Sequence, residues 1–203
     1  HIDITGILSN LGLILYYQGN YDDAPYYHRR AYTMRRNFYP FNHIDIAENL
    51  YNIGNSCYQY GKYSEALDYY LQTLDIEEKF YSPYHAAITL CLNNIGCTLD
   101  QQKKYAEALH CYQHPLKINQ KLYASGHPNM AYTLNNIGNI LCQQKSYKDV
   151  LEYYHQAFNI RERFYPFEHV DIVDSLNNIG ITYMEMIEPK ISLNYLQRTW
   201  SQY

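Results

Sequence analysis

The sequence lacks the features that mark several common classes of protein. It has no run of about 18 apolar residues of the kind that spans a membrane. Sixteen Lys and Arg against twenty Asp and Glu give 203 residues a formal charge of −4, with no basic excess. Proteins that bind nucleic acid or anionic membranes through charge are expected to be basic. We therefore expect neither nucleic acid nor a membrane among the partners.

Motifs for catalysis and metal binding are also missing. The chain contains no G-x-S-x-G, no phosphate-binding glycine loop, no H-E-x-x-H and no Cys and His pairing typical of a nucleophile. Its five cysteines form no C-x-x-C pair and leave an odd thiol, which favours a reducing compartment. The sequence thus predicts a cytoplasmic protein that is not an enzyme and has no cofactor.

Valine, a residue that favours β-strands, is scarce. Valine occurs three times, whereas Leu, Gln and Glu are common, and this balance favours helices. Tyrosine is the exception, with 26 residues, several times its ordinary share. The composition therefore predicts an all-α fold with many aromatic contacts.

The dominant feature of the sequence is a repeat of 42 residues. Five glycines recur at that interval, each after Asn and then Leu or Ile, and five histidines recur at the same step. Repeats of this length indicate a single array over residues 1–203. Its units are about 1–42, 43–84, 85–126, 127–168 and 169–203, the last truncated or capping.

Each repeat predicts two helices joined by a short turn. In the second repeat, apolar residues at steps of three and four predict helices from Ile46 to about Tyr60 and from Tyr63 to about Phe80. Such a pair cannot bury its apolar face alone and must stack on its neighbour. The predicted fold is an α-solenoid of about five helix-turn-helix repeats.

The repeated glycines predict close contacts between the two helices of each repeat. A glycine inside a helix costs roughly 0.5–1 kcal/mol relative to Ala, so five at one register need a compensating benefit. We expect the small residues Ala24, Ala66 and Ala108 to lie opposite them. Pro115, well inside a second helix, predicts a local kink.

The repeat resembles the tetratricopeptide repeat. In the second unit the signature spacing is occupied by Leu50, Ile53, Gly54, Gly61, Tyr63, Ala66 and Tyr70. The 42-residue length, the His-containing connector and the L-N-N-I-G segments look like the kinesin light chain subclass. This resemblance implies a right-handed superhelix with the first helices inside, an adaptor role in cargo binding, and kinesin heavy chain or cargo as partners. It also implies a place at the cytoskeleton.

Asparagines on the first helices are the leading candidates for binding. A carboxamide offers both donors and an acceptor, so a column of them can hold the backbone of an extended peptide. The alternative is that they hydrogen-bond neighbouring helices and stabilise the array. The residues expected in the concave groove are Asn10, Asn52, Asn55, Asn93, Asn94, Asn135, Asn136, Asn139, Asn177, Asn178, Tyr16, Tyr51 and Tyr58.

The charge of these first helices predicts the kind of ligand. Kinesin light chain grooves take acidic peptides with the help of basic residues, whereas here the inner positions include Glu48, Asp100 and Asp174. We expect peptides that are neutral or mildly basic. A helical-repeat RNA reader and an accessory module of a larger enzyme or signalling protein are the alternatives.

Two other clusters have structural interpretations. The histidines at the 42-residue step lie roughly 20 Å apart if repeats stack, which is too far for one metal ion, so they read as helix-start residues. His110 and His114 have ligand spacing but no third ligand. The arginines at 29, 30, 35 and 36 imitate a nuclear-import signal, and a solvated helix face is the preferred interpretation.

Overall fold

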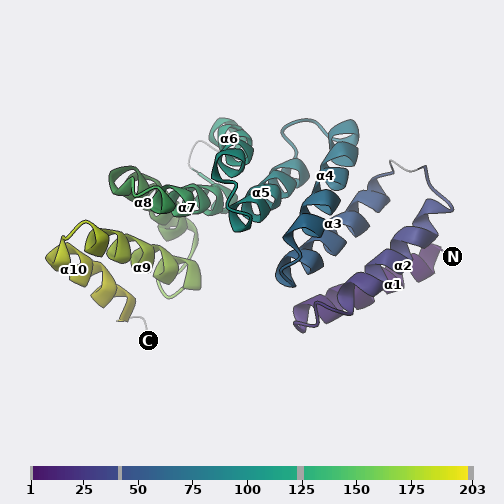
Figure 1. The fold of residues 1–203 in the computed structure, drawn as a ribbon, viewed down its shortest axis with the longest axis horizontal. Coiled ribbons are helices and arrows are strands. Elements are labelled where there is room, and N and C mark those ends of the chain that lie inside the picture. Colours follow the sequence, from purple (N-terminus) through teal and green to yellow (C-terminus); the bar gives the residue numbers. More distant parts are fainter. Residues whose placement is uncertain (1, 41–42, 123–125, 201–203) are drawn as a thin grey trace. The chain divides into compact units, whose positions relative to one another are not determined.

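The computed structural model describes residues 2–40, 43–122 and 126–200 (Figure 1). These residues form ten helices and no strand, which confirms the all-α prediction. The helices are α1 (Ile2–Tyr17), α2 (Ala24–Arg36), α3 (Ile44–Gln59), α4 (Tyr63–Phe80), α5 (Ala86–Gln101), α6 (Tyr105–Leu122), α7 (Pro128–Gln143), α8 (Tyr147–Phe164), α9 (Val170–Glu185) and α10 (Pro189–Trp200).

The chain divides into two compact units, residues 1–111 and 112–203. The division falls inside α6, between Cys111 and Tyr112. Pro115 has no N–H, so α6 lacks the hydrogen bond that residue 115 would donate to the carbonyl of Cys111. The helix nevertheless continues through Pro115. The kink and the single array over residues 1–203 stay predictions.

Within each unit, consecutive helices pack against one another as tandem hairpins. In the first unit α2 packs on α1 and α3, and α4 packs on α3 and α5. In the second unit α8 packs on α7 and α9, and α9 packs on α10. We call the odd-numbered helices the first helices and the even-numbered ones the second helices. The helix-turn-helix prediction is confirmed.

The turn inside each hairpin uses a left-handed backbone residue at the same register. Gly19 and Gly61 adopt positive φ without steric cost, whereas Lys103, Lys145 and Ile187 hold φ near 60° despite their side chains. A β-branched residue is disfavoured in this region. The turn geometry of the repeat is thus kept even where its glycine is replaced.

The connector between repeats ends in a histidine that caps the next first helix. In four repeats the Nδ1 atom of this histidine accepts a hydrogen bond from a backbone N–H two residues later, at 3.2 Å. In three of them a tyrosine ring stacks on the histidine, with centroids 3.7–4.1 Å apart. The helix-start interpretation is confirmed for His43, His85, His127 and His169, and His1 lies outside the described residues.

Three of the repeated glycines lie against rings, not against the alanines. A Cβ atom added to Gly54 would meet Cε1 of Tyr70 at 2.8 Å, and one added to Gly138 would meet Cε1 of Tyr154 at 2.5 Å. In the first repeat the atoms nearest Gly12 belong to His28. The expectation that small residues face these glycines was wrong, because the space is needed for a bulky ring.

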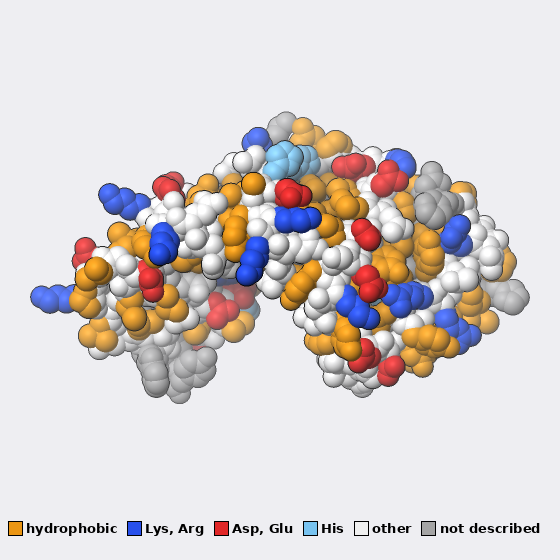
Figure 2. All heavy atoms as spheres, in the orientation of Figure 1, with side chains coloured by type: hydrophobic (Ala, Val, Ile, Leu, Met, Phe, Trp, Pro, Cys, Tyr) orange, Lys and Arg blue, Asp and Glu red, His pale blue; other side chains and the backbone are white. Residues whose placement is uncertain are grey.

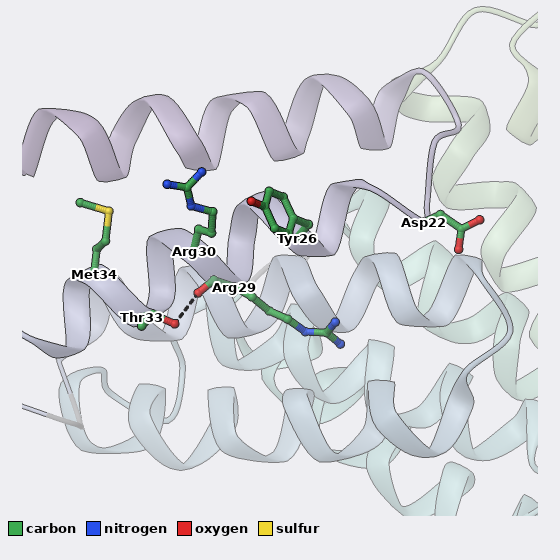
Figure 3. A pocket seen from close by; sticks show the side chains of 6 residues that line it. All are labelled: Asp22, Tyr26, Arg29, Arg30, Thr33 and Met34. Atoms are coloured by element: carbon green, nitrogen blue, oxygen red, sulfur yellow. Dashed lines mark hydrogen bonds between the residues drawn. The ribbon is translucent and has the colours of Figure 1, made fainter.

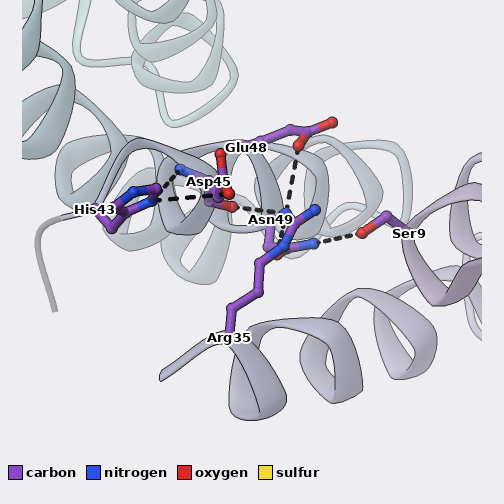
Figure 4. Close-up of polar contacts among 6 residues, drawn as sticks. All are labelled: Ser9, Arg35, His43, Asp45, Glu48 and Asn49. Atoms are coloured by element: carbon purple, nitrogen blue, oxygen red, sulfur yellow. Dashed lines mark hydrogen bonds and ion pairs between the residues drawn. The ribbon is translucent and has the colours of Figure 1, made fainter. Parts of the chain in front are cut away.

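Polar side chains link neighbouring repeats inside the stack. The guanidinium of Arg35 on α2 donates to the carbonyl of Asp45 and to Oδ1 of Asn49 on α3, both at 2.7 Å (Figure 4). Asn49 in turn donates to Oγ of Ser9 on α1 at 2.9 Å. Arg35 also lies 3.3 Å from the exposed carboxylate of Glu48. One buried cluster therefore joins three helices.

The arginine and its acceptor recur at the equivalent positions of the second unit, but other residues stand there in the middle of the chain. Arg161 on α8 donates to Oγ of Ser175 on α9 at 2.6 Å. Between α4 and α5 the equivalent positions hold Glu77 and Cys91 instead. Glu77 is 8% exposed and its Oε2 atom has no hydrogen-bond partner. Burial raises the pKa of this carboxyl from 4.5 to about 7.

Replacing Gly138 by Ala tests the contact between glycine and ring. The new Cβ overlaps the ring of Tyr154, so we expect the free energy of unfolding to fall by about 1–3 kcal/mol. Gly6→Ala is the control, because no atom lies within 4 Å of its Cβ position, and it should stabilise helix α1 by about 0.5–1 kcal/mol. If denaturant melts gave the same change in the free energy of unfolding for Gly138→Ala and Gly6→Ala, the ring of Tyr154 would not fill this space.

The buried carboxyl of Glu77 predicts a pH dependence of stability. Its pKa is higher in the folded than in the unfolded chain, so the folded state binds the proton more tightly. The stabilisation is complete below about pH 4.5 and is lost as the pH rises to about 7, by at most about 1.36 kcal/mol per pH unit. Glu77→Gln should flatten the profile over this window, whereas Glu78→Gln on the exposed face should leave it unchanged.

Candidate functional site

The candidate site is the surface that side chains of neighbouring first helices form within each unit, here called the first-helix surface. In the first unit it is bridged by the carboxamide of Asn94 on α5. This group donates to the hydroxyl of Tyr51 at 2.9 Å and to Oδ1 of Asn55 at 3.2 Å, both on α3. Between α1 and α3, Gln59 donates to the hydroxyl of Tyr16 at 3.4 Å. The predicted residues therefore do meet across adjacent repeats.

In the second and fourth repeats, a tyrosine of the second helix holds the asparagine that follows the packed glycine. The Tyr70 hydroxyl donates to Oδ1 of Asn55 at 2.8 Å, and the Tyr154 hydroxyl donates to Oδ1 of Asn139 at 2.7 Å. Burial raises the pKa of both tyrosines well above the usual range, so each hydroxyl stays a donor. The orientation of both carboxamides is fixed from inside the repeat.

Two of the repeats without this asparagine, the first and the fifth, also lack the tyrosine. Leu13 takes the place of Asn55 in the first repeat, and the packed ring there is His28, which is fully buried with neither ring nitrogen hydrogen-bonded. Burial lowers the pKa of His28 to about 4, which keeps the ring neutral. In the fifth repeat Ile181 is matched by Leu196 against Gly180. The third repeat does not follow this pattern, because it has Cys97 and Tyr112 at the two positions.

The second unit repeats the bridge between first helices. Asn178 on α9 donates to Oδ1 of Asn135 on α7 at 3.2 Å. Asn178 lies at the register of Asn94, and Asn135 lies at the register of Tyr51. The same pair of positions therefore links first helices in both units, with a carboxamide replacing the phenol as the acceptor.

The structure divides the predicted residues by exposure. Asn52 and Asn93 are buried, with 8% and 1% of their surface exposed, so they lie in the packed part of the hairpins. The others are accessible to differing extents. Asn10 and Asn177 are exposed, and the half-buried ones are Tyr16, Tyr51, Tyr58, Asn55, Asn94, Asn135, Asn136, Asn139 and Asn178.

The first helices contain no Lys or Arg. All sixteen cationic side chains of the chain lie on second helices, in turns or in connectors. The first helices carry seven acidic residues, namely Asp3, Asp45, Glu48, Asp100, Asp171, Asp174 and Glu185. Burial raises the pKa of Asp100 from its ordinary value. A ligand on this surface therefore meets carboxamides, phenols and carboxylates.

Sequence reasoning missed the groups that hold these asparagines in place. No contact of Tyr70 or Tyr154 with these asparagines was predicted, and neither were the bonds of Arg35 and Arg161 to Asn49 and Ser175 on the next helix. The two arginines are three repeats apart, each at a position followed by a small polar residue fourteen places on. That spacing was a usable signal, but only with the register of the stack already known.

The arginines of α2 differ in their exposure and in their partners. Arg35 has a side chain only 11% exposed, so the solvated-face interpretation was wrong for this residue. Arg29 points away from Arg30 and Tyr26 in Figure 3 and pairs with Glu65 at 3.5 Å. Tyr26, Arg29 and Arg30 are among the residues that line a pocket of about 420 Å³ on the surface of α2. On the face drawn in Figure 2, charges of both signs are interspersed with apolar side chains.

The described residues contain neither a metal-binding cluster nor a helix suited to span a membrane. No group of three or more His, Cys, Asp or Glu in that part of the chain is arranged to hold a metal ion. Among the same residues, no helix has the length and apolar character that crossing a bilayer requires.

The fold and the first-helix surface define an α-solenoid of tandem helical hairpins, a scaffold type that serves protein interaction. Comparison with family models is more specific. The tetratricopeptide repeat model matches residues 3–79, 45–121 and 89–163. The chain belongs to the tetratricopeptide repeat (TPR) family, as its 42-residue pattern predicted. No curated protein matches the sequence significantly.

Solved structures share the fold at low sequence identity. One holds the nearly identical TPR-like repeats of a candidate kinesin light chain from Podosopora anserina, with 13% identity, a TM-score of 0.81, and coverage of 100% of this chain and 96% of that one. A second is BtubC (BKLC) from P. vanneervenii, with 17% identity, a TM-score of 0.83, and coverage of 96% and 78%. A third is a Rap protein complexed with competence and sporulation factor, with 18% identity and a TM-score of 0.79. The alignment with Rap covers 98% of this chain and 53% of that one.

Removing the carboxamide of Asn55 tests whether it supports the repeat. Asn55→Ala leaves the buried hydroxyl of Tyr70 without its acceptor, so we expect a loss of about 1–3 kcal/mol in the free energy of unfolding. In a Tyr70→Phe background the same change should cost clearly less. Asn177→Ala, at an exposed position, should stay within about 0.5 kcal/mol of the parent chain. A similar loss in both backgrounds would contradict this role.

Proposed function

We propose that the chain is a non-catalytic adaptor module that binds extended peptides, neutral or mildly basic in charge, along its first-helix surface. The separation of charge between the two kinds of helix carries the proposal. Seven carboxylates and no cation lie on the first helices, so a strongly acidic ligand would meet no counter-charge there.

The accessible carboxamides supply the polar contacts. A carboxamide offers two donor hydrogens and an oxygen with two lone pairs. The hydrogen bond from Asn178 to Asn135 uses one donor and one lone pair, so both side chains can still bind a ligand. Asn94 and Asn136 occupy the equivalent register in the third and fourth repeats. Groups held in place before binding lose little entropy when a peptide arrives. Internal bridging and peptide binding are therefore compatible in one residue.

Aromatic side chains supply the apolar contacts. The ring of Tyr58 lies edge-on to Tyr63 with centroids 5.5 Å apart, and Tyr16 lies edge-on to Tyr21 at 5.3 Å. Burial raises the pKa of Tyr58 to about 12, so its phenol is neutral at physiological pH. A half-buried rigid phenol combines apolar area with a hydrogen bond, as binding sites commonly require.

The relatives support the class of partner. The Rap protein of similar fold is complexed with competence and sporulation factor, and the repeats from Podosopora anserina are described as those of a candidate kinesin light chain. We therefore propose a cargo or adaptor interaction similar to that of kinesin light chains. The five free thiols fit a reducing compartment such as the cytoplasm.

A peptide array probed with the purified chain tests the charge preference. We expect neutral and mildly basic sequences to dominate the bound peptides, because the surface they contact has no Lys or Arg. A predominance of acidic sequences would refute the preference. Binding of a selected peptide should weaken by about 1–3 kcal/mol when Asn94 and Asn136 are both replaced by Ala.

Two controls separate direct contact from support of the fold. Tyr51→Phe removes the hydroxyl that Asn94 binds but leaves the carboxamide in place, so peptide affinity should fall far less than in the double Ala variant. Gln72→Ala with Gln156→Ala removes two carboxamides from second helices and should leave affinity unchanged. Equal losses in the Tyr51→Phe and double Ala variants would show that the asparagines act only through the fold.

A further inference from the structure

The second helices α4 and α6 form the walls of an apolar groove, and the first helix α5 contributes to its base. The groove has a volume of about 500 Å³, within the range of sites that bind small chemical groups. Its larger apolar lining residues are Leu67, Leu71, Ile95, Leu99 and Cys111. All of them belong to the first unit, so the groove is complete within one compact part of the chain.

The preceding groove, between α2 and α4, contains a ring and a cation of its own. The guanidinium carbon of Arg29 lies 6.0 Å from the centroid of the Tyr69 ring, and one guanidinium nitrogen lies 3.5 Å from the carboxylate of Glu65. All three residues line this groove. A cation is stabilised both by the face of a ring and by a neighbouring carboxylate. Arg29 therefore shows how a cationic side chain fits between two second helices.

At the equivalent positions of the α4–α6 groove, only the carboxylate is kept. One 42-residue repeat further along the chain, Leu71 takes the place of the arginine, Cys111 that of the phenol and Glu107 that of the carboxylate. The other four repeats all have tyrosine at the position of Cys111. Glu107 is exposed, and no described side chain forms an ion pair with it. This groove thus lacks the ring and the cation of its neighbour.

The groups that remain indicate what fits the groove. Burial raises the pKa of the Cys111 thiol, so the thiol is neutral and adds to the apolar surface. The aliphatic side chains around the thiol favour an apolar ring. The carboxylate of Glu107, four residues before Cys111 on the same side of α6, favours a positive charge beside that ring. His110 also lines the groove and offers ring nitrogens for hydrogen bonds.

We propose that the α4–α6 groove is a second binding site, which takes an aromatic side chain of a partner peptide together with an adjacent arginine or lysine. The ring takes the place that tyrosine holds in the other repeats, and the cation pairs with Glu107 as Arg29 pairs with Glu65. The site goes beyond the function proposed for the first-helix surface. None of the residues proposed to contact peptide there lines this groove, so either site can fail without the other.

Three capped dipeptides titrated into the purified chain separate the ring from the charge. The probes are acetyl-Tyr-Arg-amide, acetyl-Tyr-Glu-amide and acetyl-Ala-Arg-amide, and binding is followed through the backbone amide signals of α4 and α6 in NMR spectra. We expect the Tyr-Arg dipeptide to bind at least about threefold more tightly than either of the others, because each lacks one of the two contacts. Absence of binding by the Tyr-Arg dipeptide, or equal binding by all three, overturns the proposal.

Filling the groove from within the chain should remove the site without unfolding the protein. Cys111→Tyr restores the residue of the other repeats, so we expect the melting temperature to stay or rise while affinity for the Tyr-Arg dipeptide falls at least about fivefold. Leu71→Arg, at a position 48% exposed, supplies the cation internally and should also weaken binding. Cys111→Ala keeps the groove open and is the control. Full affinity in both filled variants, or an equal loss in Cys111→Ala, overturns the proposal.

The charge preference has its own matched pair of variants. In Glu107→Gln the Tyr-Arg and Tyr-Glu dipeptides should bind equally, because the carboxylate that distinguishes them is gone. Glu78→Gln removes the same charge from α4 outside the groove and should preserve the preference. Asn94→Ala with Asn136→Ala should leave dipeptide binding unchanged, which separates this site from the first-helix surface. A preference that survives in Glu107→Gln, or that Glu78→Gln abolishes equally, overturns the role of Glu107.

Discussion

The contact between a bare helix position and a buried ring is the constraint on which the first, second and fourth repeats depend. Gly54 and Gly138 leave room for the rings of Tyr70 and Tyr154, and a single added carbon would remove that room. This close approach also brings the phenol hydroxyl to the asparagine next to the glycine. Helix packing and the geometry of the first-helix surface therefore have one cause.

That shared cause explains why the side chains proposed to bind peptide also have structural roles. A carboxamide next to a packed glycine is fixed by the tyrosine beneath it and is still partly accessible from the other side. The bridge from Asn94 to Tyr51 and Asn55 links adjacent repeats in the same way. A surface built like this is rigid before a ligand arrives, and rigid groups bind with a smaller loss of entropy.

The 42-residue period was sufficient to predict the helices, their hairpins and the capping histidines, because these depend on residues close together in the chain. The partners of the asparagines were harder to predict. Whether a carboxamide bridges repeats depends on a residue 39 or 43 positions away, as for Asn94 with Asn55 and Tyr51. Alanine was expected opposite glycine from size alone, whereas the structure fills that space with a ring. Periodicity shows which positions are equivalent, but not which equivalent positions touch.

Equivalent positions also differ in chemistry along the chain, and this makes the stacking junctions unequal. Arg35 and Arg161 bind acceptors on the next helix, whereas at the same register Glu77 is buried with one oxygen unpaired. A buried carboxyl is tolerated when protonated and costly when ionised, so this junction loses stability as the pH approaches neutrality. In a solenoid, stability is a sum of repeat and junction terms, and a weak junction opens first. Helix α5, which forms one side of this junction, also carries Asn94, so the bridge to Tyr51 and Asn55 links repeats next to the junction whose stability depends on pH.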